Sequence, residues 1–189
     1  MPVPRDLALL AGRSVLGGYL AAHGAQKLFG SFGGHGIDAT ATGFGRIGLR
    51  PAALMARVAA LCELGGGTLT AAGAAYPLGP VTIAGTMAVA ASTHLGNGPF
   101  ASNRGYELPL TNLAAALALG VAGPGGISVD GATGVHLPRS LVRAAVAGAV
   151  VAGAATVAMV LRARPPALSP SEPSPAPHEG PQRDDEPAR

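Results

Sequence analysis

Residues 7–22, "LALLAGRSVLGGYLAA", form an almost wholly apolar run that leads directly into the basic, glycine-rich stretch "HGAQKLFGSFGGHG", residues 23–36. From Leu7 to Phe29 the segment has the length of a membrane-spanning helix, which needs about 20 mostly apolar residues. Arg13 interrupts the apolar run, and Gln26 and Lys27 follow it in place of a small-residue cleavage site. We therefore interpret the segment as a retained membrane helix and not as a cleaved signal peptide.

The composition of the whole chain also indicates a membrane protein. Its 189 residues are 48% hydrophobic and 12% charged, which is about half the roughly 25% charged share of soluble domains. The alternative, a soluble protein with very apolar core helices, would show charged helix faces that these segments lack. The formal net charge of +3 is small and scattered. We therefore expect the lipid bilayer as a partner and no nucleic acid.

Four later segments have a similar apolar character. They are Ala52–Ala75, Leu78–Leu95, Leu108–Ala122 and Leu141–Leu161. With the first segment they predict an all-α integral membrane protein, an antiparallel four-helix transmembrane bundle plus a fifth C-terminal transmembrane helix. We expect a four-helix core over residues 1–130, a linker and the fifth helix over 131–164, and a disordered Pro-rich tail over 165–189.

Small and polar residues mark the expected contact faces of the four core helices. Helices in lipid pack where small residues let their backbones approach each other. The predicted inward faces are Arg13, Gly17, Leu20, Gly24 and Lys27 in the first helix; Glu63, Gly66, Gly67, Thr70 and Ala74 in the second; Thr82, Thr86, Ala90, Thr93 and Asn97, with His94 adjacent, in the third; and Glu107, Thr111, Ala114 and Ala118 in the fourth.

The up-and-down order of the helices places many polar residues at one mouth of the bundle. This predicted vestibule contains His23, Gln26, Lys27, His94, Asn97, Arg104 and Glu107, with His35 and Arg46 nearby. A histidine and a lysine can hydrogen-bond the carbonyl oxygens of a quinone headgroup, and a carboxylate or a histidine can carry protons. The alternative is that these side chains reach to the membrane interface and cap helix ends.

Two charges are expected deeper in the bundle. Arg13 and Glu63 lie on adjacent antiparallel helices, and an unpaired charge at that depth costs about 3 kcal/mol. We predict that the two form a buried pair, with a protonated Glu63 or a proton-relay role for Glu63 as alternatives. Asp130, which follows "GPGGISV", is predicted to anchor a loop to a nearby arginine or a backbone amide.

The sequence supplies no redox centre of its own. Cys62 is the only cysteine, which excludes an internal disulfide, a CxxC redox pair and a thiolate metal cage. The histidines lack the spacing of a zinc or haem site, so we expect no bound metal and no intrinsic cofactor. Any enzymatic activity therefore needs a quinone or a partner chain.

Six motifs, in this order and spacing, resemble the DoxX family of small bacterial integral membrane proteins. They are "RSVLG" from Arg13, "HGAQKLFG" from His23, "ELGGG" from Glu63, "HLGNGPF" from His94, "GYELPL" from Gly105 and "GPGGISVD" ending at Asp130. The resemblance spans the whole predicted four-helix core, and the fifth helix and the tail lie outside it.

The resemblance implies a bacterial inner-membrane protein with one of two roles. One is the membrane subunit of a quinone-linked oxidoreductase, of the thiosulfate:quinone type, in thiol or sulfur oxidative stress. The other is a non-catalytic scaffold that docks soluble redox enzymes of the superoxide dismutase or sulfurtransferase type. A small-solute transporter ranks behind both, because the chain shows no inverted repeat. The excess of Lys and Arg on the vestibule side predicts a cytoplasmic vestibule and tail.

Overall fold

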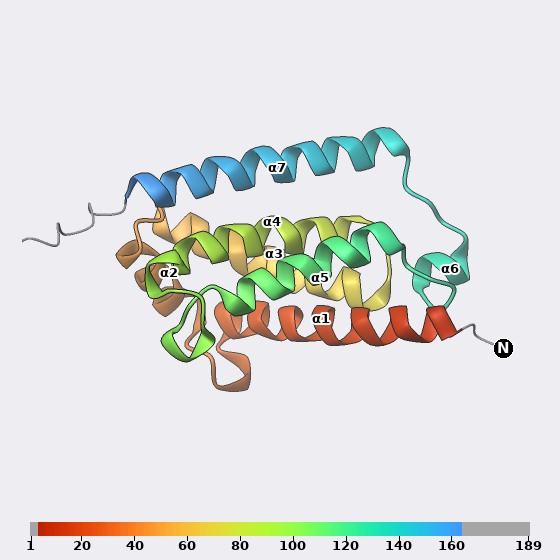
Figure 1. Ribbon diagram of the computed structural model, residues 1–189, viewed down its shortest axis with the longest axis horizontal. Helices are drawn as coiled ribbons and strands as arrows, with labels where there is room; N and C mark the ends of the chain where they lie inside the picture. The colour runs from red at the N-terminus through yellow and green to blue at the C-terminus, as the bar shows by residue number, and fades with distance from the viewer. Residues whose placement is uncertain (1–3, 164–189) are drawn as a thin grey trace, which may run out of the picture.

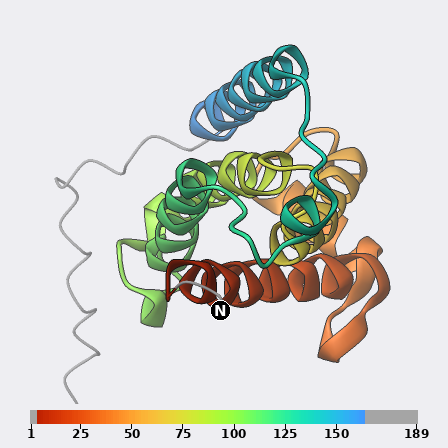
Figure 2. The same ribbon diagram turned by 90° about the vertical axis from the view of Figure 1, so that its right-hand side faces the viewer.

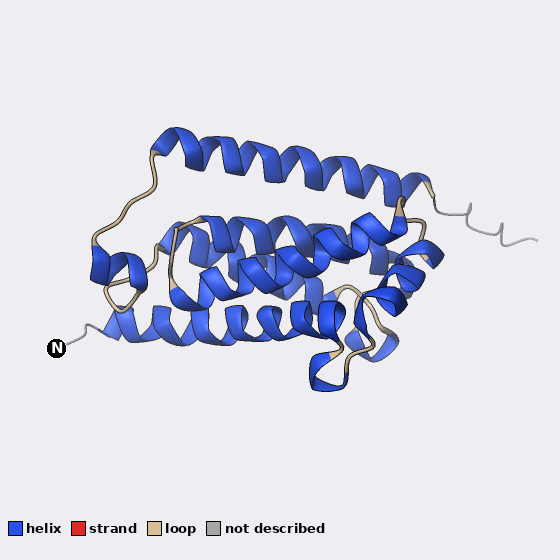
Figure 3. Cartoon of the chain, turned by 180° about the vertical axis from the view of Figure 1, so that it is seen from behind, coloured by secondary structure: helices blue, strands red, loops and turns tan. Residues whose placement is uncertain are grey.

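The computed structural model describes residues 4–163, and in that range the chain forms helices without any strand (Figure 1 and Figure 3). All five predicted helices are present, with slightly shifted ends. They are α1 (Pro4–Phe29), α3 (Ala52–Ala72), α4 (Leu78–His94), α5 (Glu107–Ala122) and α7 (Arg139–Arg162). The all-α class is therefore confirmed for the described residues, whereas the predicted tail over 165–189 lies outside them.

Four of the long helices, α1, α3, α4 and α5, pack side by side in cyclic order, and neighbouring helices run in opposite directions (Figure 1 and Figure 2). Within residues 4–163, α3 and α7 are the two helices that are long and apolar enough to cross a membrane, and α5 is apolar but shorter. That α1, α4 and α5 also cross the bilayer stays a prediction.

The pair α1 and α3 has the most extensive helix contact, and glycines on both helices explain it. A Cβ added at Gly17 would lie only 2.5 Å from the carbonyl oxygen of Gly67. Gly24 faces the backbone of Ala60 and Leu64 in the same way. Only hydrogen fits at such positions, as small-residue packing of membrane helices requires. The buried residues accordingly match the predicted faces of these two helices: Arg13, Gly17, Leu20 and Gly24 of α1, and Glu63, Gly66, Gly67 and Thr70 of α3.

The predicted inward face of α5 is wrong, and that of α4 is correct only in part. The core of the bundle is formed by larger apolar side chains. Helix α4 also approaches α3 through glycine, because a Cβ added at Gly79 would lie 2.7 Å from the backbone nitrogen of Thr70. Thr111, Ala114 and Ala118 of α5 are exposed. In α4, Ala90 packs against the core and Thr82 lies against Gly66 of α3, whereas Thr86 and Thr93 line a cavity. The buried core residues are Leu16, Leu20, Ile83, Ala84, Met87 and Ala116.

The structure also contains two helices that the sequence did not predict, α2 (Gly36–Arg46) and α6 (Val129–Thr133). The stretch that contains α2 is rich in Gly and Thr, which is typical of a loop. In α2 the hydroxyls of Thr40 and Thr42 donate to carbonyl oxygens one turn back, and the helix packs on α3. Tertiary packing thus outweighs the low helix propensity of this segment.

Helix α7 packs on α4 and stands apart from the other long helices (Figure 2). This contact is looser than that between α1 and α3. A Cβ added at Gly85 of α4 would lie 3.7 Å from Ala149 of α7, and one added at Gly153 of α7 would lie 3.9 Å from Gly85. These are ordinary van der Waals distances, so the two backbones are not in the close contact that makes glycine obligatory.

Candidate functional site

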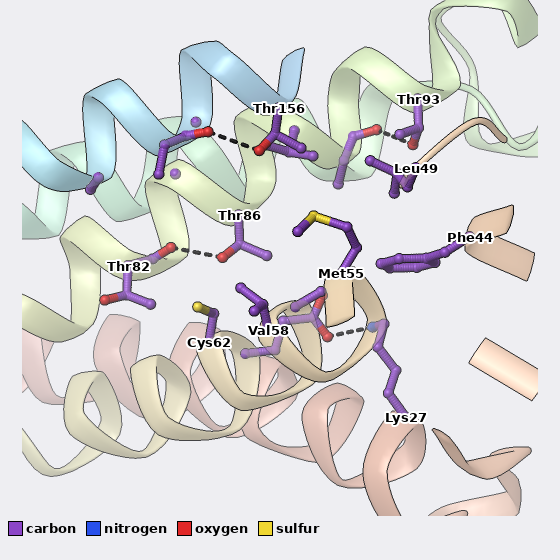
Figure 4. A pocket seen from close by; sticks show the side chains of 18 of the residues that line it. Lys27, Phe44, Leu49, Met55, Val58, Cys62, Thr82, Thr86, Thr93 and Thr156 are labelled. Atoms are coloured by element: carbon purple, nitrogen blue, oxygen red, sulfur yellow. Dashed lines mark hydrogen bonds and ion pairs between the residues drawn. The ribbon is translucent and has the colours of Figure 1, made fainter. Parts of the chain in front are cut away.

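A cavity of about 520 Å³ is bounded by α3, α4 and α7 and by the C-terminal end of α2 (Figure 4). Most of its lining is apolar or small, and one wall consists of Gly148, Ala149, Ala152 and Gly153 of α7. Val58 of α3 and Ala152 both line the cavity and are exposed. Because α7 packs on α4 and barely on α3, the cavity opens sideways between α3 and α7.

An ion pair between Lys27 and Glu63 lies in the wall of this cavity (Figure 4). Lys27 comes from the last turn of α1 and Glu63 from the middle of α3. The Glu63 side chain is 7% exposed and that of Lys27 is 26% exposed. Lys27 therefore reaches from the end of α1 to a carboxylate that would otherwise be an unpaired charge in apolar surroundings.

Arg13 and Glu63 do not form a pair, contrary to the prediction. Arg13 is fully buried, and its guanidinium donates to the carbonyl oxygens of Ala71 at 3.1 Å and Ile127 at 2.5 Å. The glycine contacts set a register in which Arg13 lies beside Ala71, eight residues and about 12 Å along α3 from Glu63. Arg13 thus caps the C-terminal end of α3, where free carbonyl groups and the helix dipole attract a cation.

His94, in the last turn of α4, also lines the cavity. Its Nδ1 atom lies 2.8 Å from the carbonyl oxygen of Ala90 and 2.9 Å from the hydroxyl oxygen of Thr93. A carbonyl oxygen can only accept a hydrogen bond, so Nδ1 carries the hydrogen, and in the neutral ring Nε2 is left as an acceptor. The cavity therefore presents both a cationic donor and a histidine acceptor.

Two of the predicted vestibule residues instead hold the loop that follows α1. Nδ1 of the exposed His23 lies 3.0 Å from Oε1 of Gln26. The Gln26 side-chain amide donates to the carbonyl oxygen of Phe32 at 3.3 Å. These contacts stabilise the turn at residues 30–35, and neither His23 nor Gln26 lines the cavity.

Three further vestibule residues lie in or beside the loop between α4 and α5. The side-chain amide of Asn97 donates to the carbonyl oxygen of Arg104 at 3.0 Å, and Glu107 accepts from the backbone N–H of Ala101 at 2.8 Å. None of them lines the cavity. Of the seven predicted vestibule residues, the structure therefore brings only Lys27 and His94 to the cavity, and the other five serve loop structure.

Asp130 of α6 fastens the opposite end of the bundle. Its carboxylate accepts from the backbone N–H groups of Ala75, at 2.9 Å, and Tyr76, at 2.8 Å, in the turn between α3 and α4. The Asp130 backbone N–H donates in return to the carbonyl oxygen of Gly73 at 3.1 Å. Asp130 thus accepts hydrogen bonds from two backbone amides, which is one of the two predicted kinds of partner. The nearby Arg13 donates its hydrogen bonds to carbonyl oxygens and not to Asp130.

The sequence did not reveal that Cys62, Thr82 and Thr86 share the cavity with Lys27 and Glu63. The Thr86 hydroxyl donates to the carbonyl oxygen of Thr82 at 2.9 Å, so its hydrogen is used within α4. Within residues 4–163, no group of three or more His, Cys, Asp or Glu side chains is arranged to hold a metal ion. The polar chemistry of the cavity therefore comes mainly from Lys27, Glu63 and His94.

Comparison with protein-family models gives a match to the DoxX family over residues 8–95. The matched segment contains Lys27, Glu63 and His94, whereas α5, α6 and α7 lie outside it. No curated protein and no solved structure matches the chain. Residues 8–95 thus match a DoxX domain, and together with the apolar helices this match indicates a membrane protein of the DoxX family.

Proposed function

We propose that the protein is the membrane subunit of a quinone-linked oxidoreductase complex, and that its cavity binds the quinone headgroup beside Lys27 and Glu63. The observation that carries this proposal is a buried ion pair in the wall of an otherwise apolar cavity. A ligand of such a site must be mostly apolar and must carry a few groups that form hydrogen bonds. A quinone has this character, and when bound it supplies a carrier for two electrons and two protons.

The residues of the cavity fit this ligand in size and in hydrogen bonding. The volume of about 520 Å³ lies within the roughly 300–1,000 Å³ typical of small-molecule sites. The Lys27 ammonium has three N–H donors, of which the Glu63 carboxylate uses one, so donors remain for a carbonyl oxygen. Nε2 of neutral His94 is an acceptor for a hydroxyl group.

The ion pair also gives protons a path between the cavity and the end of the bundle. Lys27 is partly exposed, and Glu63 is almost fully buried against the cavity. The Lys27 ammonium can give a proton to the Glu63 carboxylate, and the resulting amine can regain a proton from water. His94 lines the cavity from α4 and offers Nε2 as a further hydrogen-bond acceptor.

The electrons must come from a partner, because the one cysteine of the sequence cannot form a dithiol centre. We propose a soluble redox enzyme of the superoxide dismutase or sulfurtransferase type, bound at the vestibule end in the bacterial inner membrane. Exposed apolar side chains on the outer faces of α1, α3, α5 and α7 support the proposal that the helix bundle lies in lipid. They include Val15 and Tyr19 of α1, Leu54 and Leu61 of α3, Leu117 and Val121 of α5, and Val150 and Val151 of α7.

The test is the quinone content of the full chain purified from its native membrane in mild detergent. Glu63→Gln removes the carboxylate charge at the cavity, and Glu107→Gln is the matched control, because Glu107 bonds a loop amide outside the cavity. We expect stoichiometric quinone in the unaltered chain and in Glu107→Gln. In Glu63→Gln we expect a loss of about tenfold, the cost of a charge-assisted hydrogen-bond network.

Two results would overturn the proposal. Equal quinone content in all three proteins would remove Glu63 from the binding site. Soluble enzymes that co-purify without any quinone would instead favour the scaffold role. Each variant must elute as a single species in size-exclusion chromatography, so that loss of quinone is not caused by unfolding.

A further inference from the structure

The cavity is longer than the ring of a quinone requires. Its lining on α4 runs from Thr82 to His94, which is about 18 Å at 1.5 Å per residue. Lys27 and His94 come from helix ends on the vestibule side, and the far end is lined by Thr82 and Cys62 (Figure 4). A headgroup held at Lys27 therefore leaves the far part of the cavity to another portion of the ligand.

The α7 wall of this far part consists of small residues, of which Gly148 faces open space and Ala149 and Gly153 lie against Gly85 of α4. A Cβ added at Gly148 would meet no atom within 4 Å. Ala149, Ala152 and Gly153 complete the wall, and Ala152 is exposed although it lines the cavity. Larger side chains at these positions would fill the cavity, so their smallness keeps it open.

The same region connects the cavity to the outer surface of the helices. Val58 of α3 is 45% exposed and lines the cavity opposite α7. Helix α7 packs loosely on α4. In a bilayer, the opening between α3 and α7 would face hydrocarbon chains, because both helices are long and apolar enough to cross it.

We propose that the small-residue wall of α7, Gly148, Ala149, Ala152 and Gly153, binds the hydrocarbon chain of a long-chain quinone that enters from the bilayer between α3 and α7. This inference rests on the proposed function for the position of the headgroup, and it assigns the rest of the ligand to α7. Helix α7 lies outside residues 8–95, so the selection of chain length would be a property of this C-terminal helix.

The experiment uses the full chain in lipid nanodiscs and a long-chain quinone that carries a photoreactive diazirine in the middle of its chain. Irradiation followed by peptide mass spectrometry locates the cross-links. Ala152→Leu narrows the cavity, and Ala154→Leu is the matched control, because Ala154 is exposed, does not line the cavity and lies about 200° around the helix.

We expect cross-links at residues 148–156 of α7 and 58–62 of α3. Ala152→Leu should reduce them by about tenfold, the effect of overpacking a filled site, and Ala154→Leu should leave them unchanged. Cross-links elsewhere, or equal cross-linking in both variants, would overturn the inference. Loss of binding by a quinone without a chain in Ala152→Leu would also overturn it, because the wall would then act on the headgroup.

Two further probes separate this inference from the proposed function. A quinone without a chain tests the headgroup site alone, and a diazirine alcohol with the same chain but no quinone ring tests the α7 wall alone. If the chainless quinone binds and the alcohol does not label α7, the inference fails and the proposed function stands. If the alcohol labels α7 and the chainless quinone does not bind, the proposed function fails and the wall remains a hydrocarbon-binding site.

Discussion

The Lys27 ammonium and the Glu63 carboxylate form an ion pair that joins the end of α1 to the middle of α3 in the wall of the cavity. We expect Lys27→Met to lower the free energy of unfolding by about 3 kcal/mol, because it leaves a nearly buried carboxylate unpaired. Removing one partner of a buried ion pair typically costs about 3–5 kcal/mol. We take the low end of this range because Lys27 is 26% exposed. Chemical denaturation in mixed micelles measures this, and Lys27→Met/Glu63→Leu should recover most of the loss.

Arg13 supplies the control for this pair. Because Arg13 bonds carbonyl groups far along α3 from Glu63, Arg13→Leu and Glu63→Leu should have additive effects to within about 0.5 kcal/mol. A double-mutant cycle with strong coupling between Arg13 and Glu63, and none between Lys27 and Glu63, would contradict the register of α1 against α3.

Neighbouring glycines of α1 should respond in opposite ways to the same substitution. A Cβ at Gly17 would collide with the α3 backbone, whereas one at Gly18 would meet nothing within 4 Å. We expect Gly17→Ala to destabilise the protein by about 1–3 kcal/mol through overpacking. Gly18→Ala should be neutral or stabilising by up to about 1 kcal/mol, because alanine favours helix. Thermal unfolding in detergent compares the two, and equal effects would show that α1 and α3 are not in close contact.

Removal of the Asp130 carboxylate should release the turn between α3 and α4. Each hydrogen bond to a charged group contributes about 1.5–3 kcal/mol, so we expect Asp130→Ala to destabilise the protein by about 3 kcal/mol. Hydrogen exchange should become faster at the backbone amides of Ala75 and Tyr76, because these amides donate hydrogen bonds to the Asp130 carboxylate. Asp38→Ala, at an exposed position of α2, is the control, and unchanged exchange in Asp130→Ala would refute the anchor.

Tyr76 predicts a loss of stability at high pH. The residue lies in the turn between α3 and α4, where its hydroxyl donates to the carbonyl oxygen of Leu119. Burial raises the pKa of Tyr76, and the nearby Arg13 partly opposes this effect. A raised pKa in the folded state means that the stabilisation is complete below the unfolded value of about 10 and is lost as the pH rises through the folded value.

The measurement for Tyr76 is the unfolding midpoint from about pH 8 to about pH 11. We expect the unaltered chain to lose more stability than Tyr76→Phe over the upper part of this interval, because phenylalanine does not ionise. The difference between the two curves isolates Tyr76 from the other tyrosines and from Lys27. Parallel curves would show that Tyr76 ionises equally well in the folded and unfolded states.

The basic residues of the chain predict the orientation of the protein in the membrane. Arg46, Arg50, Arg104 and Arg162 lie near the same end of the helices as Lys27, and Arg5, Arg139 and Arg143 lie near the other end (Figure 1). The positive-inside rule then predicts a cytoplasmic vestibule and C-terminus. Topology reporters fused after Gly134 and at the C-terminus should read the outer and the cytoplasmic side, respectively. The same side for both would show that α7 does not cross the membrane.

Most of the helical architecture was predictable from the sequence, because it depends on local properties. Apolar runs of sufficient length give the five long helices. Glycines at helical spacing also identified the contact faces of α1 and α3, since close approach excludes any larger side chain there. The short helix α2 was not predictable, because its Gly- and Thr-rich segment becomes helical only through packing on α3.

The candidate site was predictable only in part. Lys27 and His94 were recognised as polar residues at one mouth of the bundle, and Glu63 as a buried charge. The partner of Glu63 depends on register: Gly17 opposite Gly67 and Gly24 opposite Ala60 bring Lys27 beside Glu63. Aligning the glycines of the two helices in this way would have identified Lys27 as the partner of Glu63 from the sequence.

The positions of the long helices, their apolar character and the small residues of the α1–α3 contact can thus be predicted from the sequence, because each is a property of one segment and its spacing. The pairing of the charges, the threonines of α4 that face the cavity and the part of α7 that forms one of its walls depend on the three-dimensional arrangement. Those features depend on the rotation and register of whole helices against each other, and packing across several helices fixes both at once.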